Sequence, residues 1–194
     1  MRVGLVGGTF DPPHEGHLAL ARAARAHFGL HLVLFVPAGQ PWRKTREITP
    51  AAHRLAMLRL AIDGDESFGI SDLELRRSGP TYTADTLDAL AGERLDDMFW
   101  FIVGADALAD LPNWHDPARI VRHAVIAVAE REGAELQRAI AAVPEFRDRI
   151  ETFPMPRVDV SSTEIRARAG RGESIAGLVP DAVAAYIREH GLYA

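Results

Sequence analysis

Short apolar runs alternate along this chain with longer segments of helical periodicity, and this alternation constrains the fold more than any other feature. The apolar runs predict strands at residues 2–8, 31–37, 68–75, 97–103 and 124–131. The intervening and following segments predict helices at residues 17–29, 49–63, 82–92, 161–170 and 180–191. Strands separated by helices form βαβ units, so we expect an α/β fold with a mostly parallel sheet and helices on both faces.

Helix boundaries and loops follow from local signals. Gly29 and Gly92 predict helix C-terminal ends, while Thr49 and Pro50 predict an N-cap and a first helical position. The proline-containing stretch 143–157 predicts a loop. Because no repeat or linker-like segment interrupts the sequence, we expect one domain over residues 1–194, with a helical C-terminal portion at 161–194.

Composition excludes several classes of function. The chain has no cysteine, so disulfides, thiolate catalysis and cysteine-ligated metal sites are excluded. Its formal net charge of −5 argues against nucleic-acid and membrane-surface partners. The N-terminal sequence predicts a strand rather than a signal peptide, and no apolar run approaches the ~20 residues of a membrane span. We therefore expect a cytoplasmic protein, and the sequence leaves a homo-oligomer open.

The stretch GGTFDPPHEGH at residues 7–17 predicts a binding site. It follows the first predicted strand, and ligands of open parallel sheets lie beyond the carboxyl ends of strands. Gly7 and Gly8 permit a close backbone approach, and the amides at the start of the next helix suit phosphate oxygens. His14 and His17, about one turn apart, could donate hydrogen bonds to a phosphate. The alternative is a pair of histidines that only cap the turn.

Three better-known motifs do not explain this stretch. The two histidines of HEGH are three residues apart, whereas the zinc-protease motif needs a spacing of four. The sequence contains no GxxxxGK[ST] loop, and its first turn lacks GxGxxG. Phosphate binding here would therefore use another design.

Two motifs together resemble the nucleotidylyltransferase superfamily: GGTFDPPHEGH matches its (T/H)xGH pattern, and VSSTEIR at 160–166 matches its SSTxIR pattern. Within that superfamily the chain is similar to the bacterial nicotinate-nucleotide adenylyltransferase family. That similarity extends over segments VPAGQPWRK, GPTYTADTL, FIVGADALADLPNW and the terminal GLY.

The resemblance implies a Rossmann-like nucleotidyltransferase fold and a reaction in NAD biosynthesis. In that reaction the 5′-phosphate of nicotinate mononucleotide attacks the α-phosphate of ATP, in line and without a covalent intermediate. The products are nicotinate adenine dinucleotide and pyrophosphate. Mg²⁺ would enter bound to ATP, whose phosphates supply most of its ligands, because the sequence has no obvious carboxylate cluster that would hold the ion without the nucleotide.

The resemblance also assigns roles to residues at the phosphates. His14, His17, Lys44 and Arg166 would form the catalytic set that contacts them. The other implied ATP-binding residues are Gly7, Gly8, Thr9, Phe10, Gly104, Asp106, Ser162 and Thr163. Each motif has a simpler interpretation. SSTE can be an ordinary capping box with a surface Arg166, and Lys44 can be a solvated charge within a basic run.

The resemblance implies a second set of residues for nicotinate mononucleotide: Gly39, Lys44, Thr83, Ala84, Trp114 and Arg131. Trp114 offers a flat face on which a pyridine ring can stack. Thr83 and the Ala84 amide, at a helix start, suit a carboxylate. The alternatives are a plain N-cap for Thr83 and ordinary packing for Trp114. Arg131 precedes Glu132, where the family has proline.

The other histidines match no motif, so we interpret them as structural or surface residues: His27, His31, His53, His115, His123 and His190. Three rival functions share part of the pattern. Phosphopantetheine adenylyltransferases share both superfamily motifs, and cytidylyltransferases would use CTP, but neither accounts for GPTYTADTL and PNW. The third rival is a catalytically silent nucleotide-binding module. It is disfavoured because every expected phosphate-contacting residue is present.

Overall fold

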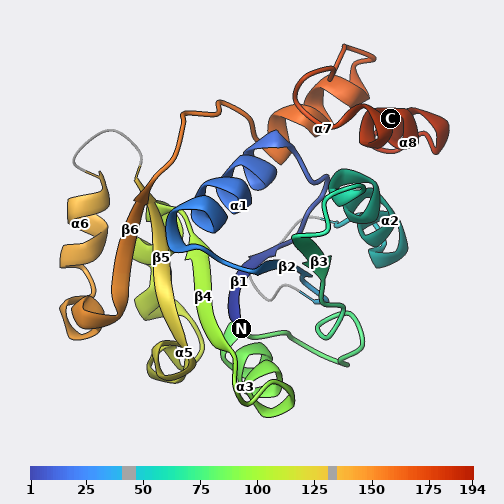
Figure 1. Ribbon diagram of the computed structural model, residues 1–194. Coiled ribbons are helices and arrows are strands. Elements are labelled where there is room, and N and C mark those ends of the chain that lie inside the picture. The colour runs from blue at the N-terminus through green and yellow to red at the C-terminus, as the bar shows by residue number, and fades with distance from the viewer. Residues whose placement is uncertain (41–46, 131–134) are drawn as a thin grey trace.

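The computed structural model describes residues 1–40, 47–130 and 135–194. In these residues six strands form one parallel sheet in the order β3-β2-β1-β4-β5-β6 (Figure 1). The strands are β1 (Arg2–Gly8), β2 (Leu32–Pro37), β3 (Phe68–Ile70), β4 (Met98–Val103), β5 (Ala124–Glu130) and β6 (Ile150–Pro154). The expected parallel sheet is therefore confirmed.

Helices cover both faces of the sheet (Figure 1). The α-helices are α1 (Glu15–Phe28), α2 (Ala51–Ile62), α3 (Thr83–Glu93), α4 (Ala105–Asp110), α5 (Pro117–His123), α6 (Glu135–Ala141), α7 (Ser162–Gly170) and α8 (Asp181–Glu189). The described residues also form two short 3₁₀ helices: η1 (Leu111–Asn113) lies between α4 and α5, and η2 (Pro144–Arg149) lies between α6 and β6. Among the helices that the structure describes, none has the length and apolarity to cross a membrane.

Strand side chains alternate between two cores because successive residues point to opposite faces. In β4, Trp100 and Ile102 pack with the buried faces of α1, α2, α7 and α8. Phe99 and Phe101 pack on the opposite face with α3, α4, α5 and α6. Both faces of the sheet are thus apolar, which explains why the strands appear in the sequence as continuous apolar runs.

The predicted loop at residues 143–157 was wrong in part, because it contains η2 and the edge strand β6. β6 pairs in parallel with β5, and Phe153 from this strand is fully buried. Its prolines misled the prediction: Pro144 lies in the first turn of η2 and Pro154 ends the strand. Proline is tolerated in the first turn of a helix, where its missing amide has no partner to lose, and on an edge strand, which leaves one row of amides unpaired.

Helix ends agree with the sequence at one position and differ at others. Gly29 is the C-cap of α1 in the left-handed conformation, with φ of 59°, as expected. Gly92, by contrast, lies inside α3, which continues to Glu93. Pro50 is the N-cap of α2, so Thr49 stands one residue before the cap. The third predicted strand, over 68–75, shortens to the three residues of β3.

The order of the strands creates a crevice beside β1. Strands β2 and β3 are added in sequence on one side of β1, and β4 is then added on the other side. Such a reversal opens a crevice at the carboxyl ends of the two central strands, the usual ligand site of this sheet type. In this protein the crevice lies where β1 ends at Gly8 and β4 ends at Val103.

Candidate active site

The loop between β1 and α1, residues 9–14, is a tightly fixed structure, and we call it the signature loop. Phe10 has a φ of 50°, a value that non-glycine residues rarely adopt. Its ring is buried and meets Phe35 edge to face, with ring centroids 5.8 Å apart. A Cβ on Gly8 would lie 3.2 Å from this ring, so the glycine permits the turn. Phe10 therefore anchors the loop, in addition to any backbone contact with a nucleotide.

His14 and His17 lie together at the start of α1. Their rings stack with centroids 3.7 Å apart, and Phe10 packs edge-on against His17 at 4.9 Å. The backbone amide of His14 donates a hydrogen bond to Nδ1 of His17 at 3.2 Å. A neutral imidazole whose Nδ1 accepts must carry its proton on Nε2. His17 can therefore donate from Nε2 without carrying a charge.

Both histidines are neutral in the ligand-free protein near pH 7. Burial lowers the pKa of His14 from 6.5 to about 4. Burial, and secondarily the neighbouring His14, holds the pKa of His17 well below its ordinary value. A bound phosphate would act in the opposite direction, since a nearby anion favours the charged imidazole. The pair is thus suited to receiving an anion.

Acid should destabilise the ligand-free protein through this pair. Below pH 6.5 His14 becomes protonated in the unfolded chain, whereas in the folded chain it stays neutral until about pH 4. The free energy of unfolding therefore decreases as the pH is lowered from 6.5 to about 4. For His14 we expect a loss of about 2 kcal/mol between pH 7 and pH 5. Denaturant unfolding at both pH values, on wild type and His14→Gln, measures it. The variant should lose correspondingly less, and an equal loss in both would contradict the assignment.

The second motif docks directly onto the signature loop. Ser161 is the N-cap of α7 and accepts a hydrogen bond from the Glu164 amide at 3.1 Å. Ser162 donates its hydroxyl to the Pro12 carbonyl at 3.0 Å. Arg166 donates from Nη1 to the Asp11 carbonyl at 2.7 Å. The capping interpretation therefore holds for Ser161, whereas Ser162 and Arg166 join two segments 150 or more residues apart.

Arg166 also donates from Nη2 to the hydroxyl of Thr163 at 3.2 Å, on the exposed side of α7. The guanidinium is thus held between the signature loop and the first turn of α7. The two motifs thus lie together, with Ser162, Thr163 and Arg166 beside the signature loop.

Arg54 supports the signature loop from α2, a role that the sequence did not reveal. It lies in α2 with only 2% of its surface exposed. Its Nη1 donates to the Thr9 carbonyl at 2.8 Å, and its Nε donates to the Thr49 carbonyl at 2.9 Å. Arg54 thereby fixes the start of the signature loop. The sequence pattern gave no signal, because an arginine in a helix is ordinarily a surface residue.

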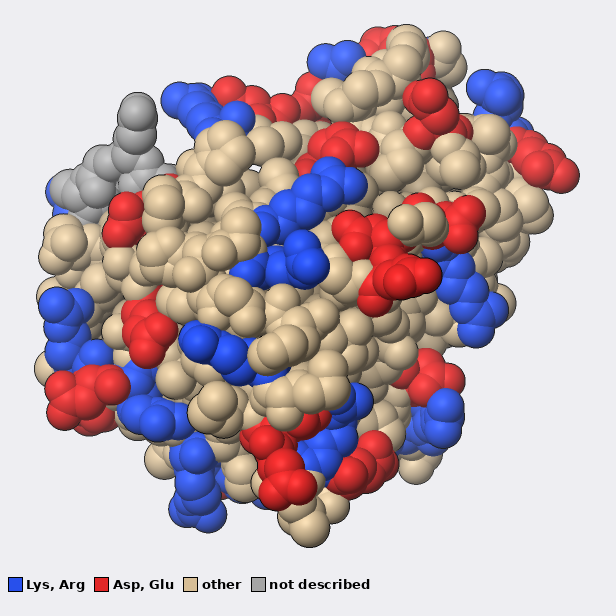
Figure 2. All heavy atoms as spheres, viewed as in Figure 1, with Lys and Arg blue, Asp and Glu red and all other residues tan. Residues whose placement is uncertain are grey.

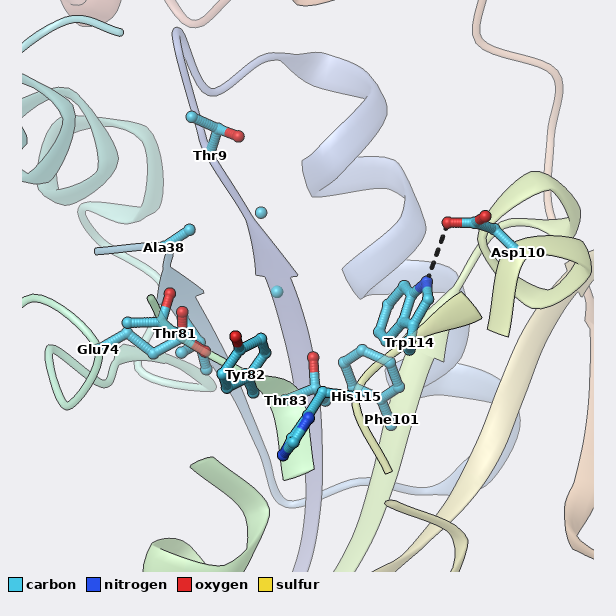
Figure 3. A pocket seen from close by; sticks show the side chains of 13 residues that line it. Thr9, Ala38, Glu74, Thr81, Tyr82, Thr83, Phe101, Asp110, Trp114 and His115 are labelled. Carbon is cyan, nitrogen blue, oxygen red and sulfur yellow. Dashed lines mark hydrogen bonds between the residues drawn. The ribbon is translucent and has the colours of Figure 1, made fainter. Parts of the chain in front are cut away.

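A cavity of about 240 Å³ opens in the crevice beside the signature loop (Figure 3). Several segments line this cavity: the ends of β1 and β2, the segment around Glu74, the start of α3 and the η1 region. Its lining is Gly7, Gly8, Thr9, Val36, Ala38, Glu74, Thr81, Tyr82, Thr83, Phe101, Asp110, Trp114 and His115. The structure thus brings Gly7 and Gly8, predicted for ATP, to one cavity with Thr83 and Trp114, predicted for the acceptor.

Trp114 forms one wall of this cavity (Figure 3). Its Nε1 donates to Oδ2 of Asp110 at 3.1 Å, and Phe101 meets its ring edge to face at 5.8 Å. The indole is partly exposed, so one face remains available to a flat ligand. The packing interpretation and the stacking interpretation are therefore compatible, since Phe101 and Asp110 hold the ring in place.

The start of α3 forms another part of the lining. Tyr82 is the N-cap, so Thr83 is the first helical residue and not the cap itself. The Ala84 side chain is fully buried, but its amide belongs to the first turn, whose donors have no partner within the helix. His115 stacks on Tyr82 with ring centroids 4.3 Å apart. Our interpretation of His115 as a structural or surface residue missed its place in the cavity.

Opposite Trp114, the cavity ends on a buried acid, Glu74 (Figure 3). The Thr86 hydroxyl donates to its Oε1 at 2.9 Å, and burial raises the pKa of this carboxyl. A Cβ on Gly39 would lie 2.2 Å from the Glu74 carbonyl, so only glycine fits there. Gly39 is thus required by packing behind the cavity, and it is not among the described lining residues.

The remaining predicted residues lie at the edge of the crevice or beyond the described structure. Gly104 follows β4 as the N-cap of α4, and Asp106 is an exposed residue in the first turn of that helix. Lys44 and Arg131 lie outside the described residues. Their proposed contacts with ATP and the acceptor stay predictions.

The parallel sheet with this strand order, its crevice, and the joined histidine and SSTEIR motifs define a nucleotidyltransferase. Residues 5–168 match the model of the cytidylyltransferase-like family. The chain is 48% identical, over 99% of its length and 91% of the relative's, to a protein of Thermomicrobium roseum named "Probable nicotinate-nucleotide adenylyltransferase". A relative of the same name from Dehalococcoides mccartyi is 42% identical over 100% of this chain and 97% of its own.

The chain therefore belongs to the nicotinate-nucleotide adenylyltransferase family, within the cytidylyltransferase-like nucleotidyltransferases. The fold has a solved counterpart in the nicotinic acid mononucleotide adenylyltransferase of Plasmodium falciparum in complex with NaAD. The TM-score is 0.82 at 20% identity, over 99% of this chain and 97% of that one. At this identity the likeness supports the shared fold alone.

Proposed function

We propose that this protein transfers the adenylyl group of ATP to nicotinate mononucleotide and releases pyrophosphate. The observation that carries the proposal is the cavity. It is lined both by Gly7 and Gly8, from the GGTFDPPHEGH stretch, and by Thr83 and Trp114, the residues expected at the acceptor. Family membership supports the same reaction, because the curated relatives carry this enzyme name. We place the reaction in the cytoplasm on the strength of the family.

The chemistry asks the protein to position two anions and to neutralise charge. An oxygen of the acceptor 5′-phosphate forms a bond to the α-phosphorus of ATP, while the bond from that phosphorus to the bridging oxygen of pyrophosphate breaks. His17 donates from Nε2 to a phosphate oxygen, and Arg166 supplies positive charge beside it. His14, stacked on His17, completes the donor set. The predicted Lys44 would add a further positive charge.

Mg²⁺ would enter with ATP rather than occupy a site of its own. Across the described residues, no three histidine, aspartate or glutamate side chains converge as a metal site. The triphosphate itself offers the oxygen ligands that Mg²⁺ prefers. When bound, the ion would neutralise phosphate charge. The residues of the chain would hold the nucleotide through the signature loop and Arg166.

The acceptor is proposed to bind with its pyridine ring against Trp114 and its carboxylate at the start of α3. The first-turn amides and the Thr83 hydroxyl offer donors there, and a helix N-terminus favours an anion. The uncharged amide of nicotinamide mononucleotide would gain less from this environment. Selection of nicotinate therefore follows from the same geometry.

Pyrophosphate release from ATP, measured with each acceptor in turn, tests the function. We expect release with nicotinate mononucleotide, and weaker release with nicotinamide mononucleotide. Equal use of these two would keep the reaction but contradict the role of α3 in selecting the carboxylate. Release with phosphopantetheine alone would replace the proposed acceptor, and release from CTP instead of ATP would replace the donor. No release with any acceptor would favour the silent nucleotide-binding module.

A further inference from the structure

The C-terminal segment holds the signature loop at several points. Beyond the two bonds from α7, the Leu178 carbonyl accepts a hydrogen bond from the Glu15 amide, the first residue of α1, at 3.0 Å. The last of these contacts comes from Tyr193, whose hydroxyl donates to Oδ1 of Asp11 at 2.8 Å. Asp11 is 1% exposed and follows Phe10 in the loop. Two residues separated by 182 positions are thus joined beside the histidines.

The backbone is arranged to bring Tyr193 to this place. After α8 the chain turns at Gly191, which has a φ of 56°, and the Leu192 amide donates to the Ile187 carbonyl at 3.0 Å. A Cβ on Gly170 would lie 2.7 Å from the Tyr193 carbonyl oxygen, so α7 approaches this backbone as closely as glycine permits. The tyrosine ring is half-buried against the core that contains α1 and α2.

Strained backbone lies at Tyr193 and at Phe10, the residue that precedes Asp11. Among the described non-glycine residues, positive φ occurs at Phe10, Asp116 and Tyr193, and Tyr193 has the largest value, 70°. A non-glycine residue in this region of φ is strained and persists where its surroundings hold it. Here the two segments that carry Phe10 and Tyr193 hold each other. Burial and the negative charge of Asp11 both raise the pKa of Tyr193, so its hydroxyl remains a donor at neutral pH.

We infer that Tyr193 is a positioning residue of the adenylyl-transfer site: its hydrogen bond to Asp11 fixes the signature loop and thereby the placement of His14 and His17. The inference rests on the proposed function for its kinetic consequence. It acts through Asp11, because the structure shows the Tyr193 hydroxyl on this carboxylate and not in the cavity.

The test compares Tyr193→Phe with Tyr186→Phe as a matched control. Each change removes one hydroxyl from the C-terminal segment, and the Tyr186 hydroxyl contacts Nδ1 of His53 at 2.9 Å, on α2. For Tyr193→Phe we expect kcat/KM for ATP to fall roughly 10-fold or more, because sub-ångström to ångström misplacement of reacting groups is that costly. The KM for the acceptor should change little. Tyr186→Phe should keep wild-type kinetics.

A second readout does not depend on catalysis. Hydrogen–deuterium exchange of the peptide that covers residues 9–14 should be faster in Tyr193→Phe and unchanged in Tyr186→Phe. If wild type transfers no adenylyl group to any acceptor, the proposed function fails, while this exchange still decides the positioning role. Unchanged exchange and kinetics in Tyr193→Phe would overturn the inference. An equal defect in both variants would also overturn it, since it would indicate general loss of stability.

Asp11 variants test the route of the effect. Asp11→Asn keeps an oxygen that can accept from Tyr193 and should retain most activity, whereas Asp11→Ala should behave like Tyr193→Phe. The double variant Asp11→Ala with Tyr193→Phe should be no slower than Asp11→Ala alone. A further slowing of similar size in the double variant would show that Tyr193 acts elsewhere, and would overturn the route through Asp11.

Discussion

Replacing His17 with alanine should lower kcat for adenylyl transfer by about 10²–10³-fold, which is the usual cost of removing one preorganised donor from a developing negative charge. The Nε2 proton of His17 is fixed because Nδ1 accepts the His14 amide. Alanine removes that donor and the edge contact with Phe10. Steady-state kinetics with nicotinate mononucleotide, together with circular dichroism and thermal unfolding, measure the effect and check the fold.

A suitable control is His27→Ala in the same helix. His27 is exposed near the other end of α1, where its ring touches Phe28, so its loss should leave turnover unchanged. His17→Gln is also informative, since an amide can still donate one hydrogen bond and should recover part of the rate. Turnover at the wild-type rate in His17→Ala would remove this histidine from the mechanism.

The second large effect is expected for the acceptor. Trp114→Ala should raise the KM for nicotinate mononucleotide by about 5-fold to 150-fold, the range that 1–3 kcal/mol of stacking represents. The KM for ATP should change far less, because Trp114 lines the cavity beside Thr83, whereas His14 and His17 are not among the residues that line it. Measurement of both KM values on one enzyme preparation separates the two substrates.

Two further variants identify the cause. Trp114→Phe keeps an aromatic face and should recover much of the affinity for the acceptor. Asp110→Ala removes the partner of Nε1 and should produce a smaller rise in the same KM, since the ring then loses its fixed orientation. An increase confined to ATP, or a loss of thermal stability with both KM values unchanged, would show that Trp114 belongs to the core.

The sequence predicted the elements that have a regular apolar pattern and the site residues that belong to a motif. Apolar runs predicted five of the strands in the described structure. Four of these, β1, β2, β4 and β5, have a continuous apolar pattern because they are buried on both faces. β6 was not predicted, because a five-residue edge strand with prolines on both sides has little hydrophobic pattern. In the site, the motifs indicated His14, His17, Ser162 and Arg166, and the structure brings these four together.

Other parts of the site could not be read from the sequence, because they depend on contacts between distant segments. Arg54 looks like a surface residue of α2 until its carbonyl partners are known. The neutral state of the histidines depends on how deeply α1 is covered. Glu74 and His115 line the cavity only because their loops converge on β1. Sequence spacing within one element carries no information on such contacts.

The bonds from α7 to the signature loop also impose an order on the making of this site. Ser162 and Arg166 are synthesised 150 and 155 residues after the carbonyl groups that they bind. While the ribosome is still extending the chain, β1 and β2 can pair. The Asp11 and Pro12 carbonyls cannot yet accept their hydrogen bonds, because Arg166 and Ser162 have not been synthesised. Contacts of such long sequence separation form late in folding, because closing the loop costs entropy first. A nascent chain that ends before α7 should therefore carry the histidines without a finished nucleotide site.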